Sequence, residues 1–186
     1  GNDLSAFQGA APSGPGAAML FLHALNACAT PILGAVEGNA VGIGVTMLLH
    51  FDFAYAARGA KMRLPFAPLG LCPEGASSYL LPRVAGLKRA TEWLLLGEFF
   101  SGEQAAEAGI VTAAVADGTA LENAMATAKK IAALPPEAAR VTKMLLRRAS
   151  RATVAETLDI EAEEFRRRLA SREAQAAFAA FFAKAG

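Results

Sequence analysis

An apolar run from Ala40 to Ala57 constrains the fold of this chain more than any other feature of its sequence. Two glycines fall near its start, and His50 and Asp52 interrupt it. A bilayer span needs about 20 uninterrupted apolar residues, so this run does not predict a membrane helix. It is instead expected to be buried in a folded protein, as a glycine turn, a short helix near Gly44 to His50 and a strand near Asp52 to Ala56.

Shorter apolar segments flank this run and alternate between strand and helix character. We expect strands at Pro31 to Val36, Met62 to Phe66 and Ile110 to Val115, and helices at Ala17 to Cys28, Ser77 to Val84, Lys88 to Leu96 and Gly102 to Ala108. Ser77 is expected to stand at the N-terminus of its helix, a position that serine favours. Beyond Asp117-Gly118 the composition shifts to Ala, Leu, Glu and Arg with helical spacing. The pattern predicts an α/β core over residues 1–117 and a helical region over residues 118–186.

Composition and charge exclude several classes of protein. The chain has 186 residues, 54% of them hydrophobic, and a formal net charge of +1, as expected for a globular domain with a sizeable core. No basic block is longer than Arg166 to Arg168, so nucleic acid is not expected as a partner. Because the longest apolar run is interrupted, a membrane is not expected as a partner either. Cys28 and Cys72 lack metal-ligand spacing and predict two buried or half-buried thiols in a reducing compartment, with cytoplasmic, bacterial-type localisation.

The beginning of the chain lacks features that a complete α/β fold needs. It starts Gly1-Asn2-Asp3, without a strand-like run before the first turn residues. We therefore expect part of the fold to precede Gly1, which leaves targeting open. Residues Gly9 to Pro15 are rich in Gly, Pro and Ala and predict a mobile loop.

A glycine turn, Gly42-Ile43-Gly44, lies where a strand gives way to a helix. Backbone N–H groups there have no partner within the helix and can bind an anion, which the helix dipole favours. Glycines at such a position also serve simply to permit a tight turn or close packing. The pattern alone leaves both explanations open, although the missing Gly-Lys-Ser/Thr excludes a Walker A loop.

One carboxylate, Glu74, lies between a proline and a glycine in the stretch LCPEGASSY. The apolar residues Phe66, Leu69 and Leu71 precede it. Burial among such residues would raise the pKa of the carboxyl, and a carboxylate of this kind can act as a base near neutral pH. A solvated loop glutamate fits the same spacing, so the residue pattern alone does not decide between the two.

Several segments occur together, in order and at plausible distances: GND, EGNAVGIGVTMLLHFDFAYAA, PFAPLGLCPEGASSYLLPRVAG and EFFSGEQAAEAGIV. They resemble the crotonase superfamily, also called the enoyl-CoA hydratase/isomerase family, over nearly the whole chain. The resemblance implies a crotonase-like core of stacked ββα turns and a C-terminal helical oligomerisation region that makes a homotrimer or a dimer of trimers. It also implies an acyl-CoA substrate and no separate cofactor, since coenzyme A is part of the substrate.

The resemblance further implies an oxyanion hole for the thioester carbonyl of the acyl-CoA. Its two backbone N–H donors carry over to Asn2 and Ile43. The hydratases of the family use two glutamates, and those positions match Thr46 and Phe66, neither of which can act as a carboxylate base. Ordinary hydration is therefore not expected.

The stretch PFAPLGLCPEGASSY is similar to the peroxisomal-type Δ3,Δ2-enoyl-CoA isomerases, whose single catalytic glutamate falls at Glu74. One carboxylate suffices for isomerisation, because it can remove a proton from C2 of a 3-enoyl thioester and return it at C4. The implied activity is conversion of 3-enoyl-CoA to 2-enoyl-CoA, with a place in fatty acid β-oxidation. Phe66, Leu69 and Leu71 are expected to line the substrate site and exclude water.

Other readings remain open. An enoyl-CoA hydratase or another acyl-CoA reaction of the family is one, although the aspartate used by the chlorobenzoyl-CoA dehalogenases is a glutamate here. A non-catalytic acyl-CoA-binding oligomer is another, but it would have no need of Glu74. His23 and His50 lie in apolar helical runs and are expected to be packed, which disfavours a hydrolase triad. Lys143, Arg147 and Arg148 could meet CoA phosphates, but solvated helix charges are the commoner explanation.

Overall fold

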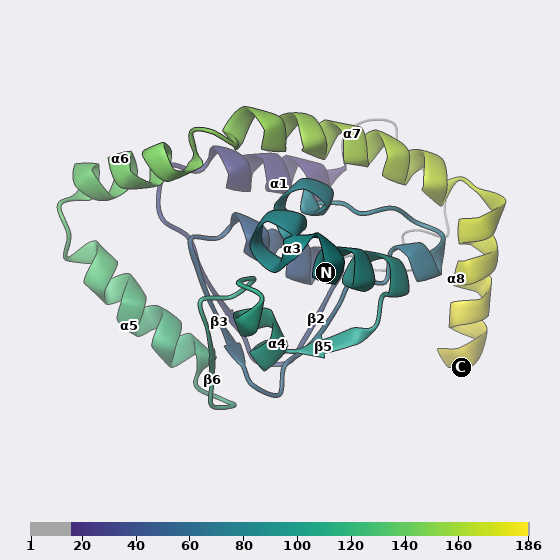
Figure 1. Cartoon of the computed structure of the whole chain (residues 1–186), viewed down its shortest axis with the longest axis horizontal. Helices are drawn as coiled ribbons and strands as arrows, with labels where there is room; N and C mark the ends of the chain where they lie inside the picture. Colours follow the sequence, from purple (N-terminus) through teal and green to yellow (C-terminus); the bar gives the residue numbers. More distant parts are fainter. Residues whose placement is uncertain (1–15, 186) are drawn as a thin grey trace.

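In the computed structural model, which describes residues 16–185, two three-stranded sheets lie at the centre and helices surround them (Figure 1). The first sheet has the order β1-β3-β6, with all strands parallel: β1 (Leu33–Val36), β3 (Phe53–Ala57) and β6 (Ala113–Val115). The second has the order β2-β4-β5, formed by β2 (Asn39–Val41), β4 (Lys61–Arg63) and β5 (Phe99–Ser101). In the second sheet β2 and β4 are parallel, whereas β4 and β5 are antiparallel.

The first four strands alternate between the two sheets, which produces a repeated ββα order. The chain enters β1 in one sheet and β2 in the other, and then forms α2 (Ile43–Thr46) and the 3₁₀ helix η2 (Met47–His50). It repeats this order with β3, β4, the 3₁₀ helix η3 (Ala67–Leu69) and α3 (Ser77–Leu96). The fold is thus a mixed α/β fold with the repeated ββα turns that the resemblance implies.

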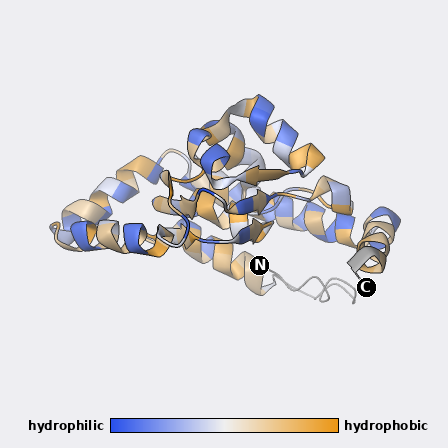
Figure 2. Ribbon diagram, turned by 90° about the horizontal axis from the view of Figure 1, so that it is seen from below, coloured by the Kyte–Doolittle hydropathy of each residue, from blue (hydrophilic) through white to orange (hydrophobic). Residues whose placement is uncertain are grey.

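The remaining helices lie outside the sheets. They are α1 (Ala17–Ala27), α4 (Gly102–Glu107), α5 (Ala120–Ala132), α6 (Pro136–Arg147), α7 (Arg151–Leu169) and α8 (Arg172–Ala185). Figure 1 shows α5 to α8 as an arc around the α/β part, with α1 lying along α7. All of them occur where helical spacing of apolar residues predicts them. Figure 2 shows that hydrophilic and hydrophobic residues alternate along these outer helices, as expected for helices that bury one face.

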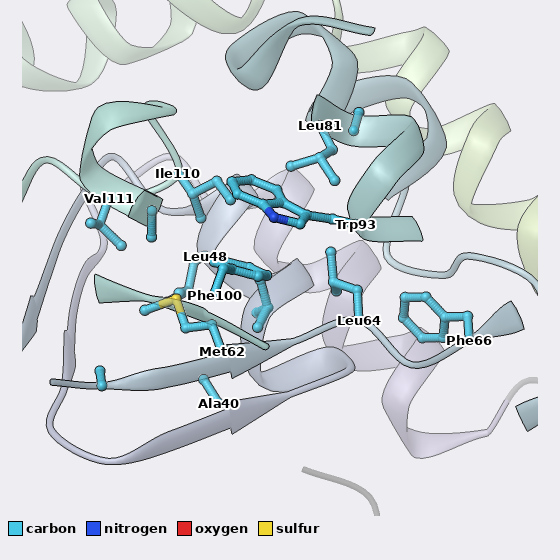
Figure 3. Packing of buried hydrophobic residues seen from close by; sticks show 14 of the residues in the cluster. Ala40, Leu48, Met62, Leu64, Phe66, Leu81, Trp93, Phe100, Ile110 and Val111 are labelled. Atoms are coloured by element: carbon cyan, nitrogen blue, oxygen red, sulfur yellow. The ribbon is translucent and has the colours of Figure 1, made fainter. Parts of the chain in front are cut away.

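The main core fills the space between α3 and the second sheet (Figure 3). Trp93 of α3 stacks on Phe100 of β5 with ring centroids 4.1 Å apart, and Met62 of β4 is fully buried beside them. Phe178 of α8 also belongs to this core, which ties the helical region to the α/β part. The domain boundary at residue 117 and the oligomerisation role of the helical region stay predictions.

Several local predictions need correction. Strands β2 and β5 were not predicted, because residues 39–41 run into the glycine turn and residues 99–101 are a short segment between two helical patterns. The strand expected at Met62 to Phe66 is Lys61–Arg63, since Pro65, just beyond it, has no N–H for a ladder. Ser77 is the first residue of α3, as expected, but it does not cap the helix: the N-cap is Ala76, with φ 55° and no side-chain hydrogen bond.

Asn2 and the loop Gly9 to Pro15 lie outside the described residues. Within residues 16–185, no helix combines the length and the apolar character that crossing a membrane requires. The two helices expected before and after Gly86 are confirmed, since that glycine has φ 75° and ψ 153° and interrupts the helical geometry of α3.

Candidate functional site

The carboxylate of Glu74 meets the hydroxyl of Thr46, 28 residues earlier in the chain. Thr46 Oγ1 donates a 2.6 Å hydrogen bond to Glu74 Oε1. Thr46 is fully buried at the end of α2, whereas Glu74 is half-buried in the loop before α3. No hydrogen bond to the other carboxylate oxygen, Oε2, occurs in the described part of the chain, which leaves that oxygen able to receive a proton.

The backbone of the loop makes this contact possible. Gly75 has φ 72°, and a Cβ at this position would lie 2.6 Å from Thr46 Oγ1. Any other residue would therefore displace Thr46 from Glu74. His50, which is buried at the end of η2, also donates a 2.8 Å hydrogen bond from Nε2 to the carbonyl of Gly75. His50 is thus packed, as expected, but it also holds the loop.

Burial tunes the acidity of Glu74. Together, three effects raise the pKa of this carboxyl to about 7: desolvation by burial is the largest, the hydrogen bond from Thr46 opposes it, and the negative charge of Glu161 adds to it. Loss of water destabilises the charged form of a carboxyl, as does a second carboxylate nearby. Glu74 is therefore poised to accept and release a proton near neutral pH. A solvated loop glutamate does not describe it.

The glycine turn forms the start of α2. Gly42 is the N-cap, with φ 56° and ψ −120°, and its N–H donates to the carbonyl of Arg63 at 2.9 Å. Its carbonyl accepts the N–H groups of Val45 and Thr46. Ile43 is the first helical residue, and its N–H has no hydrogen-bond partner within residues 16–185. It is thus free in this part of the chain to act as the oxyanion donor proposed from the resemblance, whereas Asn2, the other proposed donor, is not described.

The three apolar residues proposed for the substrate site share one turn of chain. Phe66 and Leu71 are buried in the main core, and Leu69 packs against it. The carbonyl of Phe66 accepts the N–H groups of Leu69 and Leu71, which closes the turn. Phe66 lies at one edge of the core in Figure 3. A Cβ placed on Gly42 would be 3.9 Å from its ring, so this turn lies beside the glycine turn.

One residue near this loop was not predicted from the sequence. Glu161 of α7 is only 6% exposed, and its Oε1 accepts the backbone N–H of Ser78 at 2.9 Å. Its burial could have been inferred, because it falls on the same helical stripe as Val154, Leu158 and Leu169, all of them buried. The contact across 83 residues could not.

The basic residues of α6 have mainly structural partners. Lys143 is buried and lies 2.7 Å from Asp52, and it also donates to the carbonyl of Thr30. Arg147 donates to the carbonyls of His50 and Phe51. The expectation of solvated helix charges is therefore wrong for Lys143, although Arg148 is exposed. These residues line a cavity of about 410 Å³ between α1 and α6 that does not include Glu74.

Within residues 16–185, the two cysteines and His23 add no chemistry to this site. Cys28 and Cys72 are free and half-buried, and burial raises the pKa of Cys72 to about 11, so its thiol stays protonated. His23 lies 2.9 Å from Asp159 on the outer side of the α1–α7 pair. Within residues 16–185, no three His, Cys, Asp or Glu side chains gather in a way that could hold a metal ion.

Comparison with known proteins places this geometry in a family. The family model described as enoyl-CoA hydratase/isomerase matches residues 7–185. Human enoyl-CoA delta isomerase 2 is 36% identical over 159 residues, which are 81% of this chain and 40% of that protein. The 1,2-epoxyphenylacetyl-CoA isomerase of Escherichia coli K12 is 38% identical over 156 residues, 83% of this chain and 59% of that protein. The chain thus spans less than two thirds of these relatives.

Solved structures agree with the sequence comparison. OdaA of Pseudomonas aeruginosa superposes with a TM-score of 0.93 at 40% identity, over 97% of this chain and 74% of that one. An enoyl-CoA hydratase/isomerase of Pseudoalteromonas atlantica gives a TM-score of 0.92 at 38% identity, over 98% and 73%. Fold, motifs and identity point the same way, and the chain belongs to the enoyl-CoA hydratase/isomerase family.

Proposed function

We propose that the protein isomerises a 3-enoyl-CoA thioester to the 2-enoyl-CoA, with Glu74 as its base. The observation that carries this proposal is the hydrogen bond between Glu74 and Thr46, in a loop where burial raises the pKa of Glu74 to about 7. A base with this pKa exchanges protons readily at neutral pH. Coenzyme A enters as part of the substrate, and the reaction needs no separate cofactor.

The reaction moves one proton between two carbons. Glu74 Oε2 takes a proton from C2, and the electron pair of the broken C–H bond passes into the thioester to form a dienolate. The resulting carboxylic acid then returns the proton to C4, the double bond moves to C2–C3, and the negative charge leaves the thioester oxygen. The single carboxylate is regenerated, and no water is consumed.

The dienolate oxygen needs hydrogen-bond donors that are already in place. The N–H of Ile43, at the start of α2, is the described candidate, and Asn2 is the second. Losing one such donor typically costs about 3 to 4 kcal/mol in the barrier. The buried side chains of Phe66 and Leu71 support the proposal because water excluded from the site cannot quench the intermediate.

Hydration is a less suitable reaction for this site. Adding water across a double bond uses one group to activate the water and another to protonate the carbon. Thr46 directs its hydroxyl to Glu74, and Phe66 is buried in the apolar core. Neither can ionise, so one carboxylate is left for two tasks.

A second candidate reaction comes from the relatives. The Escherichia coli protein named 1,2-epoxyphenylacetyl-CoA isomerase is 38% identical to this chain, against 36% for the human delta isomerase. This chain also matches a larger share of the Escherichia coli protein, 59% against 40%. Both names describe isomerases of CoA thioesters. Isomerisation of 1,2-epoxyphenylacetyl-CoA is therefore the second candidate. A role in fatty acid β-oxidation is proposed only with the first candidate, the isomerisation of 3-enoyl-CoA to 2-enoyl-CoA.

The test supplies a 3-enoyl-CoA, a 2-enoyl-CoA and 1,2-epoxyphenylacetyl-CoA separately and follows conjugation of the thioester by ultraviolet absorbance and the products by mass spectrometry. We expect conjugation to appear from the 3-enoyl-CoA, and Glu74→Gln to abolish it. Glu98→Gln, at an exposed position, is the matched control. Normal turnover in Glu74→Gln would refute the assignment of the base.

Other outcomes would select another reading. Loss of conjugation from the 2-enoyl-CoA would identify a hydratase, and conversion of the epoxide alone would identify the second candidate. Binding of acyl-CoA without turnover would indicate a non-catalytic binder, and chloride release from an aryl-CoA would indicate a dehalogenase.

We further propose that the protein assembles as a homotrimer or a dimer of trimers, with α7 and α8 as contacts. A monomer in light scattering would contradict this assembly.

A further inference from the structure

The helix that follows Glu74 begins without a cap from its own sequence. The N-cap of α3 is Ala76, which has no side chain that could accept a hydrogen bond. Ala76 and Ser77 are fully buried, whereas Ser78 is exposed. The first N–H groups of a helix have no carbonyl partner within it, so that of Ser78 needs an acceptor from elsewhere.

Glu161 of α7 provides that acceptor. Its Oε1 accepts both the backbone N–H and the hydroxyl of Ser78. Burial raises the pKa of Glu161, and the hydrogen bonds from the hydroxyl and the backbone N–H of Ser78 oppose this effect. A carboxylate at the N-terminus of a helix is further favoured by the helix dipole. A residue 83 positions away thus caps α3.

Packing alone does not explain a carboxylate at this place. Glu161 is 6% exposed, and its Oε2 is buried without a hydrogen-bond partner in the described structure. Burying an unpaired polar atom costs free energy. The neighbouring positions on this stripe of α7 are the apolar residues Val154 and Leu158.

The capped turn is joined directly to the proposed base. The N–H of Ser77, in the first turn of α3, donates to the carbonyl of Glu74 at 3.2 Å. Between them lie Gly75 with φ 72° and Ala76 with φ 55°, and Ala76 is the one described non-glycine residue with a positive φ. A left-handed alanine is strained and persists only where surrounding contacts hold it.

We propose that Glu161 is a positioning residue for Glu74: by capping α3 it holds the Gly75-Ala76 turn in place and so keeps the carboxylate of Glu74 against Thr46. This inference rests on the proposed function for its kinetic test. The charge of Glu161 would also act on Glu74 through space.

The electrostatic surroundings define what a pH profile should show. Glu161 raises the pKa of Glu74 and that of Cys72, whose thiol is also affected by Glu164 and Arg168 of α7. On the opposite side of the loop, burial lowers the pKa of His50, which stays neutral. Removing the charge of Glu161 must therefore lower the pKa of Glu74, since one negative neighbour disappears.

Two variants separate the cap from the charge. Glu161→Gln keeps an oxygen that can accept the bonds of Ser78 but removes the charge, so we expect kcat at alkaline pH within about twofold of wild type and an acid limb of kcat/KM moved to lower pH. Glu161→Ala removes both, and kcat is expected to fall by about tenfold or more at every pH, because the base is misplaced. Glu163→Gln, exposed on the same helix, is the control.

A second readout does not depend on turnover. The carboxyl carbon of Glu74 is followed by NMR in ¹³C-glutamate-labelled protein, with the signal assigned by its loss in Glu74→Gln. Its titration midpoint should be lower in Glu161→Gln than in wild type and unchanged in Glu163→Gln. An unmoved midpoint and acid limb in Glu161→Gln, or full kcat in Glu161→Ala, would overturn the proposal.

The two proposals can fail separately. A wild-type protein without isomerase activity refutes the proposed function, while the NMR titration still tests the influence of Glu161 on Glu74. If Glu161→Ala does not fold, as judged by near-ultraviolet circular dichroism, Glu161→Gln decides the matter.

Discussion

Gly75 and Thr46 approach so closely that a Cβ on the glycine would lie 2.6 Å from the threonine hydroxyl oxygen. The same hydroxyl donates to Glu74. The conformation of the loop and the position of the Glu74 carboxylate therefore depend on each other. A substitution at Gly75 should displace Thr46, and a substitution at Thr46 should alter the loop.

Gly75→Ala should destabilise the protein and reduce its activity. The added methyl meets Thr46, and φ of 72° strains any residue with a Cβ, so we expect a loss of about 2 to 3 kcal/mol in the free energy of unfolding by urea. Gly118→Ala is the matched control, because Gly118 has φ 83° but nothing within 4 Å of the added methyl. An equal loss in both variants would show that contact with Thr46 contributes nothing.

Thr46→Val tests the hydrogen bond to Glu74 with little change in volume. The bond lowers the pKa of Glu74, so its removal should raise that pKa. Because Glu74 works as the ionised base, the acid limb of kcat/KM should move to higher pH, opposite to the change expected for Glu161→Gln. Thr142→Val, at an exposed position of α6, should leave the pH profile of kcat/KM unchanged.

The raised pKa of Glu74 should appear in stability as well. In the folded protein this carboxyl has a pKa of about 7, against a reference value of 4.5, so the folded state retains a proton that the unfolded state releases between these values. Stability should then fall as pH rises from 4.5 through 7, by about 3.5 kcal/mol at roughly 1.4 kcal/mol per pKa unit.

The measurement is urea unfolding from pH 5 to pH 8. Glu74→Gln cannot ionise, so its stability should fall less than that of wild type over this range. Parallel curves for the two proteins would contradict a raised pKa for Glu74. This test requires no substrate and therefore stands apart from the proposed reaction.

Asp52→Asn should be strongly destabilising. Asp52 faces the buried ammonium of Lys143 at 2.7 Å, and the variant leaves that charge without its partner. A buried pair broken on one side typically loses about 3 to 5 kcal/mol. The exposed pair of Glu163 and Arg167 supplies the comparison, since Glu163→Gln should cost under about 1 kcal/mol. Similar losses would mean that Lys143 gains water when Asp52 is changed.

The long helices and the motif around Glu74 could be predicted from the amino-acid sequence. Apolar spacing placed α1 within a few residues of its observed bounds and predicted the helical region that contains α5 to α8, because a helix of ten or more residues repeats its period several times. Glu74 could be proposed as a catalytic residue because many adjacent residues of its motif carry the family resemblance. Strands β2 and β5 were missed because β2 runs into the glycine turn and β5 is a short segment between two helices, and each is defined by its partner strand.

The environment of the site depends on contacts between distant segments. Thr46 reaches Glu74 across 28 residues, Glu161 reaches Ser78 across 83, and Lys143 reaches Thr30 across 113. The amino-acid order predicts that Glu161 lies on the buried stripe of a helix, but not which helix end that stripe will meet. Hydrogen bonding and desolvation depend on distance in space, so the proton affinity of Glu74 is set only when α2, α3 and α7 have packed together.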